Sequence, residues 1–216
     1  MSFIAKDSGG GDFKKVPAGV HIGRCFKLVD LGTQEETYEG ETKLLPKVCI
    51  YWELTGEEED GTPLIDHEGG PMVIWQEYTM SLGKKAKLRA ALESWRGRQF
   101  SDDELKGFDV SKLIGAYCMV NVTHKTSQSS GKTYANVSSL TPLPAALRNA
   151  KPPSHYKNII FSVDDFDQAT FDTFHDKLKE RINQSIERRG VSRADAAPSA
   201  RAFDDVPPPS DEDCPL

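Results

Sequence analysis

One short stretch of the sequence, residues 46–56, constrains the fold more than any other. Apolar residues alternate with other residues over eight positions: Lys47, Val48, Cys49, Ile50, Tyr51, Trp52, Glu53 and Leu54. A period of two, with β-branched and aromatic residues, is typical of a strand that packs one face against a core. Gly56 and the acidic residues after it end this strand as a turn. We therefore predict a central strand whose other face points outward and carries Lys47 and Tyr51.

Four further segments have strand-like patterns. The first, 19–31, is rich in apolar residues, and its alternation shifts near Gly23 and Arg24, which predicts a bulge that bends the strand. The others span 72–82, 116–124 and 134–140, and a long loop is expected at 32–45. Between the third and fourth strands, apolar residues with helical spacing predict a helix at 84–96. This order predicts a mainly β protein: a five-stranded Greek-key OB-fold barrel with a helix between strands 3 and 4.

The remaining segments surround this barrel. We divide the chain into a mobile N-terminal arm (1–17), an OB-fold domain (18–141), a Pro-rich linker (142–157), a short strand and an amphipathic helix (158–189) and a disordered acidic tail (190–216). The helix, at 167–189, has an apolar stripe: Phe171, Phe174, Leu178, Ile182 and Ile186. Because an exposed stripe would be a sticky patch, we expect the helix to fold back on the barrel or to pair with a copy of itself, giving a homo-oligomer.

Composition limits the classes of function. The net charge is −6, and residues 203–216 hold five acids and no base, so the other residues together carry −1. A polyanion must therefore be bound by local patches rather than by a strongly basic domain. The four cysteines form no C-x-x-C pair, the histidines are scattered and there is no P-loop, so we predict no metal, no cofactor and no catalysis.

The same composition bears on location. No apolar run approaches the roughly 18 residues of a membrane span, and the N-terminus lacks the apolar segment of a signal peptide. We therefore expect a reduced, soluble, cytoplasmic protein without membrane contact.

The predicted barrel has the residues that bind single-stranded nucleic acid. OB folds bind single strands across strands 2 and 3 and the flanking loops, where aromatic rings stack on bases and lysines contact phosphates. Eight residues occupy such positions: Tyr51, Trp75 and Lys47 on the strands, and Tyr38, Lys43, Lys125, Lys132 and Tyr134 in or beside the loops. In the alternative, Trp75 packs beneath the linker or the C-terminal helix, and Tyr51 is an ordinary strand residue. Trp52 and Trp95 are expected in the core.

The predicted helix at 84–96 and the residues after it are basic. The cations are Lys84, Lys85, Lys87, Arg89, Arg96 and Arg98, against a single acid, Glu93. One interpretation is a solvated outer face. The other is a surface that contacts phosphates or binds the acidic tail.

Three stretches, 2–6, 92–100 and 132–137, resemble a family of bacteriophage replication and single-stranded-DNA-binding proteins. The resemblance extends over roughly residues 1–165. It implies binding of single-stranded DNA in a phage replication or recombination module, within the cytoplasm of a bacterial host.

The end of the chain resembles the acidic tip of bacterial single-stranded-DNA-binding proteins. The matching residues are Asp211, Glu212, Asp213, Cys214, Pro215 and Leu216. Cys214 stands where a larger apolar residue is usual, and Leu216 stands where phenylalanine is usual. The resemblance implies that the tail recruits replication or repair proteins.

The sequence therefore predicts a non-catalytic single-stranded-DNA-binding protein that acts by aromatic stacking and phosphate contacts. The alternative is a protein–protein adaptor of the replication machinery that does not bind DNA. A nuclease-like or initiator enzyme is disfavoured because the sequence lacks a metal-binding constellation.

Overall fold

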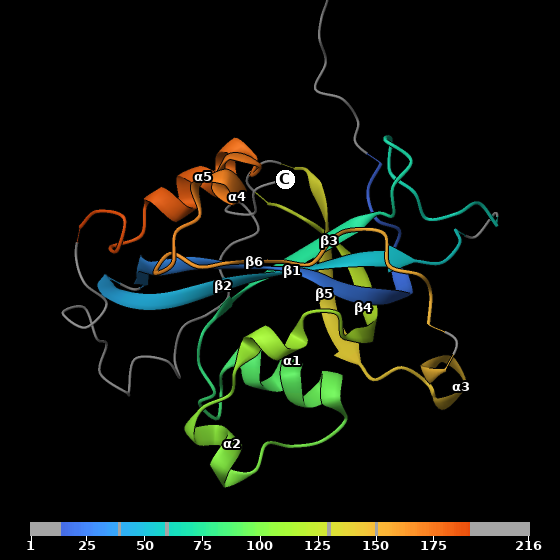
Figure 1. Cartoon of the computed structure of the whole chain (residues 1–216), viewed down its shortest axis with the longest axis horizontal. Coiled ribbons are helices and arrows are strands. Elements are labelled where there is room, and N and C mark those ends of the chain that lie inside the picture. The colour runs from blue at the N-terminus through green and yellow to red at the C-terminus, as the bar shows by residue number, and fades with distance from the viewer. Residues whose placement is uncertain (1–13, 39, 59–60, 129–130, 150, 191–216) are drawn as a thin grey trace, which may run out of the picture.

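The computed structural model describes residues 14–38, 40–58, 61–128, 131–149 and 151–190 (Figure 1). Its elements, in order, are β1 (Gly19–Tyr38), β2 (Glu41–Thr55), β3 (Val73–Thr79), α1 (Lys87–Arg96), α2 (Asp102–Lys106), the 3-10 helix η1 (Val110–Leu113), β4 (Tyr117–Thr126), β5 (Thr133–Thr141), α3 (Ala145–Arg148), β6 (Ile159–Phe161), α4 (Gln168–Asp172) and α5 (Asp176–Asn183). The prediction of a mainly β fold is confirmed.

The strands form one sheet that curves without closing. Its order is β3-β2-β1-β4-β5 with antiparallel neighbours, and β6 pairs in parallel with β1. The edge strands β3 and β5 are not hydrogen-bonded neighbours, yet their Cα atoms approach within 8 Å. The sheet is therefore barrel-like.

The loop predicted at 32–45 is wrong, because β1 and β2 continue through it as one long antiparallel pair. Their pairing runs from Ile22 opposite Thr55 to Tyr38 opposite Glu41. The register shifts between Cys25 and Lys27, which is close to the predicted bulge, and shifts again between 30 and 32. Two glutamates of this segment, Glu35 and Glu36, form ion pairs with Arg189 and Arg181 in the C-terminal part of the chain.

An inner cluster of apolar residues joins the inward faces of the strands to α1. It contains the alternating residues of β2, namely Val48, Ile50, Trp52 and Leu54. Trp52 and Trp95 are both buried, with ring centroids 5.8 Å apart, so their predicted place in the core is confirmed. Val16 also belongs to this cluster, so the described end of the predicted mobile arm packs on the sheet, while residues 1–13 lie outside the described part.

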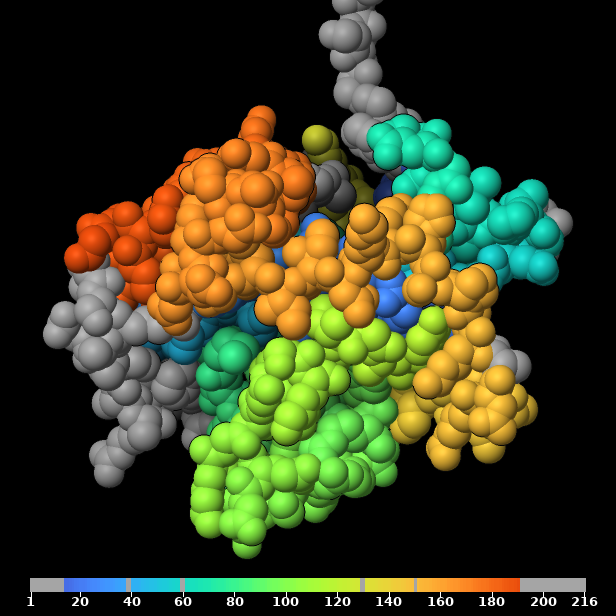
Figure 2. Space-filling model, in the orientation of Figure 1, coloured from blue at the N-terminus to red at the C-terminus, as the bar shows by residue number. Residues whose placement is uncertain are grey.

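An outer cluster covers the opposite face of β1 and β2. We call residues 155–190 the cover, because α4 and α5 lie on the side of the sheet opposite α1 (Figures 1 and 2), and β6, which leads to them, pairs with β1. The outer cluster consists of Phe26, Val29, Leu31, Cys49 and Tyr51 from the strands and Phe161, Val163, Phe171, Phe174, Leu178 and Ile182 from the cover. The apolar stripe predicted in this segment therefore folds back on the barrel.

The cover contains two helices rather than the single one predicted at 167–189. Asp167 caps α4, because its carboxylate accepts hydrogen bonds from the backbone N–H groups of Ala169 and Thr170. His175 then interrupts the helix: its backbone is extended, and its side chain accepts a hydrogen bond from the N–H of Leu178 at the start of α5. Two caps eight residues apart in sequence therefore divide the segment.

Candidate nucleic-acid interface

Tyr51 was predicted to point outward and stack on bases, and this prediction is wrong. Its side chain is 4% exposed within the outer cluster. The ring centroid of Tyr51 lies 6.1 Å from that of Trp75 and 6.5 Å from that of Phe26. The Nζ atom of Lys27 lies 3.9 Å from the Tyr51 ring centroid. The second face of β2 is buried by the cover, so Tyr51 is part of a core.

Lys47 was predicted to contact phosphates, and it too is buried, with 1% of its surface exposed. Its Nζ atom lies 2.7 Å from Glu36 Oε1 and 3.6 Å from Glu77 Oε1. Arg181 of α5 lies 3.0 Å from the same two oxygens. We call these four residues the charge network. A buried lysine requires nearby opposite charge to compensate for its lost hydration. The two carboxylates of the charge network provide this charge, and through Arg181 they also link α5 to the sheet.

The last charged residue of β2, Glu53, binds the beginning of the cover. It pairs with Arg24 on β1, Nε to Oε1, at 2.5 Å, and both side chains are almost fully buried. Glu53 also accepts hydrogen bonds from the backbone N–H groups of His155 and Tyr156. Arg24 donates to the carbonyl oxygen of Tyr156 and to Asn158 Oδ1. The pair therefore fixes the path of the chain as it enters the cover.

The sequence left two possibilities for Trp75, an outward ring that stacks on bases or a ring packed beneath the linker or the C-terminal helix, and the structure has features of both. It packs partly buried against the outer cluster, on β3 at the edge of the sheet. Its partner across the pairing is Tyr51. Trp75 is only half-buried, so part of this residue is accessible to solvent.

The predicted loop residues divide between two hairpins. Lys125 and Tyr134 face each other across β4 and β5, and Lys132 is exposed just before β5. Lys43 lies on β2, 3.9 Å from Glu41, and Tyr38 ends β1, with a side chain outside the described atoms. The tips of the two hairpins lie in different parts of the molecule (Figure 1). The eight predicted residues therefore do not share one surface.

The arginines of the basic segment around α1 are paired with carboxylates. Arg89 lies 3.0 Å from Glu93, Arg98 lies 2.8 Å from Glu104, and Arg96 also pairs with Glu104. Hydrogen bonds from Arg98 and from the backbone of Ser101 help to lower the pKa of Glu104 to about 2, so this acid stays charged. The pairing favours the interpretation of this surface as a solvated outer face.

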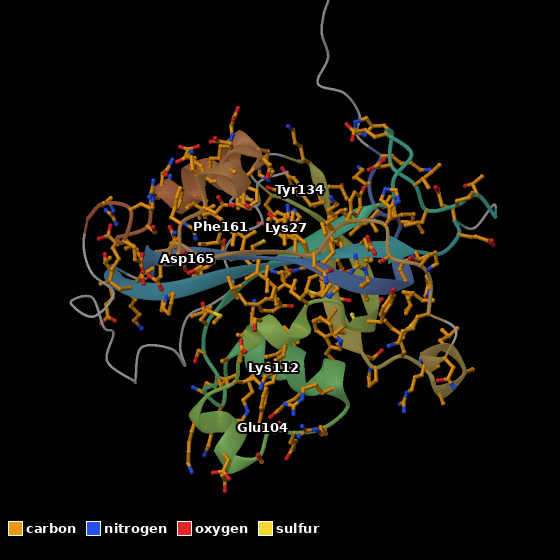
Figure 3. The ribbon with its side chains drawn as sticks, in the orientation of Figure 1. Lys27, Glu104, Lys112, Tyr134, Phe161 and Asp165 are labelled. Carbon is orange, nitrogen blue, oxygen red and sulfur yellow. The ribbon has the colours of Figure 1, made fainter. Side chains whose placement is uncertain are left out.

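Lys27 is a candidate binding residue that the sequence analysis missed. It lies opposite Tyr51, which lies opposite Trp75, so the three form one row across β1, β2 and β3. Burial lowers the pKa of Lys27. Figure 3 shows it on the side of the sheet that carries the cover. The bulge between Cys25 and Lys27 changes which residues of β1 face outward. The only sign of this bulge in the sequence is the shift in apolar alternation near Gly23 and Arg24.

Other predicted features fall outside this surface. The tail residues, from Asp211 to Leu216, lie outside the described part of the chain. Within the described residues, no three His, Cys, Asp or Glu side chains are grouped so that they could hold a metal ion. The helices of that same part are all too short or too polar to cross a membrane.

Comparison of the chain with models of known protein families gives no match, and comparison with curated protein sequences gives no significant similarity. The resemblance to phage single-stranded-DNA-binding proteins therefore stays a prediction, and the function must be argued from the fold and the surface.

Proposed function

We propose that this chain is a non-catalytic single-stranded-DNA-binding protein with an OB-type barrel. The observation that carries the proposal is the arrangement of the strands. A meander of β1, β2 and β3 is followed by α1 and then by the β4–β5 hairpin, β4 pairs with β1, and β5 approaches β3. The five-stranded OB barrel has this order, and it binds single strands on its second and third strands beside the loop between strands 4 and 5.

The proposed surface is narrower than the one predicted from the sequence. The cover occupies the middle of the β1–β2 face, so binding is assigned to the strip from Trp75 on β3 to the β4–β5 hairpin. That hairpin rises on the same side of the sheet as the cover (Figure 1) and carries Lys125, Lys132 and Tyr134. Trp75 and Tyr134 supply rings for stacking, and the two lysines supply charge for phosphates.

The biological setting proposed is a phage replication or recombination module in a bacterial cytoplasm, with the acidic tail recruiting partner proteins. This part of the proposal rests on the resemblances noted in the sequence. The adaptor hypothesis gains support from one observation, which is the burial of Tyr51 and Lys47 beneath the cover.

A titration of the full-length protein with fluorescently labelled oligo-dT tests the proposal. Replacing Trp75 by alanine removes a stacking ring, and the binding free energy should weaken by about 1–3 kcal/mol. The matched variant Trp75→Phe keeps a ring and should retain most of the affinity. If the wild-type protein does not bind oligo-dT even at low salt, DNA binding is rejected and the adaptor hypothesis takes its place.

A further inference from the structure

An exposed methionine marks the end of the inner face of the sheet. Met80 directly follows β3 and is 40% exposed, and its backbone N–H donates a hydrogen bond to the carbonyl oxygen of Pro46 on β2. Val48 and Tyr78 face each other two residues further along this pairing and lie in the inner cluster. Because side chains alternate along a strand, Pro46, Met80 and the half-buried Leu44 point to the same side of the sheet as α1. The inner face therefore continues beyond the core as a partly exposed apolar strip.

Positive charge lies beside this strip. Residues 78–92, from the end of β3 into α1, contain four bases and no acid. Arg89 is paired with Glu93, but Lys84 forms no ion pair within the part of the chain that the structure describes. Among the described residues no side chain caps α1, and its first turn contains no acid, so the helix dipole adds to the positive potential. We call three partly exposed apolar residues and three exposed lysines the rim patch: Leu44, Pro46, Met80, Lys84, Lys85 and Lys87.

The described chain ends beside the rim patch. Arg189 lies 3.1 Å from Glu35 of β1, and Glu35 is the partner of Leu44 across β1 and β2. In Figure 1, the last coloured residues after α5 lie at this same end of the β1–β2 pair. The patch extends from there toward Met80 over two strand spacings, about 10 Å. Residues 191–216 therefore continue from a point close to the patch.

The acidic residues after this point match the rim patch in charge and in apolar character. Residues 203–216 hold five acids and no base, and their apolar residues include Phe203, Val206 and Leu216. The twelve residues 191–202 span up to about 40 Å, which exceeds the distance to the patch. A tethered segment also has an effective concentration on the order of 1 mM. A contact too weak to hold a free peptide is therefore sufficient to hold this one.

We propose that the rim patch binds residues 203–216 of the same chain. The lysines lie against the acidic side chains, and Leu44, Pro46 and Met80 contact the apolar ones. Because the five acids are spread over fourteen residues, they match lysines spread along a segment better than a single converging site. Single-stranded DNA is a poorer occupant, because the apolar residues of the patch are aliphatic and the patch lacks a ring on which a base could stack.

The proposed contact goes beyond DNA binding, because the rim patch and the proposed DNA surface lie on opposite sides of the sheet. A bound acidic segment leaves Trp75 and the β4–β5 hairpin uncovered. It withholds the same acidic residues from partner proteins until a partner competes for them. The patch therefore acts as a resting site for the acidic segment.

Paramagnetic broadening in the full-length protein tests the proposal. The three cysteines in the described part of the chain are buried, so a thiol-reactive nitroxide attaches to Cys214, and mass spectrometry confirms one label per chain. The methyl NMR signals of Met80 and Leu44 should lose most of their intensity at low salt. The signals of Val20 and Ile65 should be unchanged, because these exposed side chains lie about 30 Å away at the other end of β2.

The contribution of charge is tested by salt and by a variant of the acidic segment. Salt at about 1 M, where the Debye length is about 3 Å, should restore the broadened signals. The triple variant Asp211→Asn/Glu212→Gln/Asp213→Asn keeps the side-chain shapes and should restore most of the intensity at low salt. Broadening that persists under both changes would contradict the charge match.

The apolar contact is tested by a matched pair of variants at exposed side chains. Met80→Ser should reduce the broadening of Leu44 severalfold. Ile65→Ser is the control, because Ile65 is 42% exposed and Met80 is 40% exposed, and it should leave the broadening unchanged. A melting curve for each variant checks that it is folded. Equal broadening of Leu44 in the two variants would contradict the apolar contact.

A mixing experiment shows which chain supplies the acidic segment. Spin-labelled chains without isotopes are mixed with isotope-labelled chains without nitroxide, and little broadening is expected. Broadening as strong as in the singly prepared protein would mean that the patch binds a second copy, which rejects the contact within one chain. Intensity lost equally at Met80 and Val20, or at neither, would reject the patch itself. None of these measurements uses DNA, so their failure leaves the proposed function standing, whereas absent oligo-dT binding rejects that function alone.

Discussion

The inner and outer clusters bury opposite faces of the same strands, yet they are built in different ways. The inner cluster is formed by the alternating apolar residues of the barrel and by α1. The outer cluster combines the other face of β1 and β2 with aromatic residues from the cover. Its borders are ionic, with the Arg24–Glu53 pair at one end and the charge network at the other.

This difference shows how a strand with a polar face can be buried on both sides. Each residue on the second face of β2 has its own environment: Lys47 lies in the charge network, Cys49 and Tyr51 lie in the outer cluster, and Glu53 holds the chain near Tyr156. Burial of charged groups is tolerated because opposite charges and hydrogen bonds compensate for the missing hydration. The stability of the outer cluster should therefore depend on specific hydrogen-bond and ion-pair partners. The stability of the inner cluster should depend on how completely its apolar side chains fill the core.

The largest effect is expected in the inner cluster. Trp52→Ala would leave a large cavity beside Trp95, because Trp52 is fully buried. The free energy of unfolding should fall by about 3–5 kcal/mol. Urea denaturation monitored by circular dichroism would measure this. A decrease below about 0.5 kcal/mol, the range usual for surface changes, would show that the inner cluster is not the main source of stability.

A smaller effect is expected from Glu53→Gln at the border of the outer cluster. The amide places an NH₂ group where a carboxylate oxygen accepts hydrogen bonds from Arg24 or from the N–H groups of 155 and 156. Removing hydrogen bonds to a charged group costs about 1.5–3 kcal/mol. Hydrogen exchange should quicken in the cover more than in β4 and β5. Equal changes in both regions would contradict the distinction between the clusters.

The close approach of β1 to the cover provides a third test, at Gly32. Its φ is +70°, and an added Cβ would lie 2.5 Å from the Cβ of Ser185. Gly32→Ala should therefore destabilise the protein by more than about 1 kcal/mol. Gly69→Ala is the matched control, because Gly69 also has a positive φ, of +83°, but has no atom within 4 Å of the added Cβ. Equal decreases in stability in the two variants, measured by urea denaturation, would mean that the close approach contributes nothing.

The smallest effect concerns pH. The pKa of His175 is lowered by burial and by nearby lysines, so the folded state favours the neutral imidazole. Its contribution to stability should be complete above the unfolded pKa of about 6.5 and should disappear as the pH falls through that value toward the folded pKa. Protonation of Nδ1 would also remove the acceptor that caps α5. His175→Asn, which keeps a cap, should lack this part of the pH dependence of the melting temperature.

The sequence predicted the inner half of this molecule better than the outer half. Alternation in β2 correctly identified Val48, Ile50, Trp52 and Leu54 as core residues, because a strand places every second side chain on one face. The same rule placed Tyr51 and Lys47 in solvent, and there it was wrong. Local periodicity cannot show that a segment more than a hundred residues later covers the second face.

The prediction of the candidate site was limited in the same way, because local periodicity does not show which distant residues pack on a strand. Trp75 was identified correctly as a strand residue at the sheet, but its partial burial depends on the cover. Lys27 was missed because the bulge in β1 interrupts the alternation from which its direction would be predicted. Glu36 lies in the segment predicted as a loop, although it pairs with Lys47 and Arg181 across the sheet and the cover. Such pairings between distant residues leave no periodic signal in the sequence.

The hydrogen bonds that hold the cover also bear on the order in which the chain folds. Asn158 accepts a hydrogen bond from Arg24, 134 residues earlier, and Glu187 accepts from Thr33, 154 residues earlier. Pairings across such long stretches require costly loop closure and form slowly. During synthesis, β1 and β2 emerge first and leave an unprotected aromatic and thiol-bearing face until the ribosome has released the last residues of the cover. The nascent chain is therefore most prone to aggregation during this interval, and a chaperone that shields this face would act before the cover arrives.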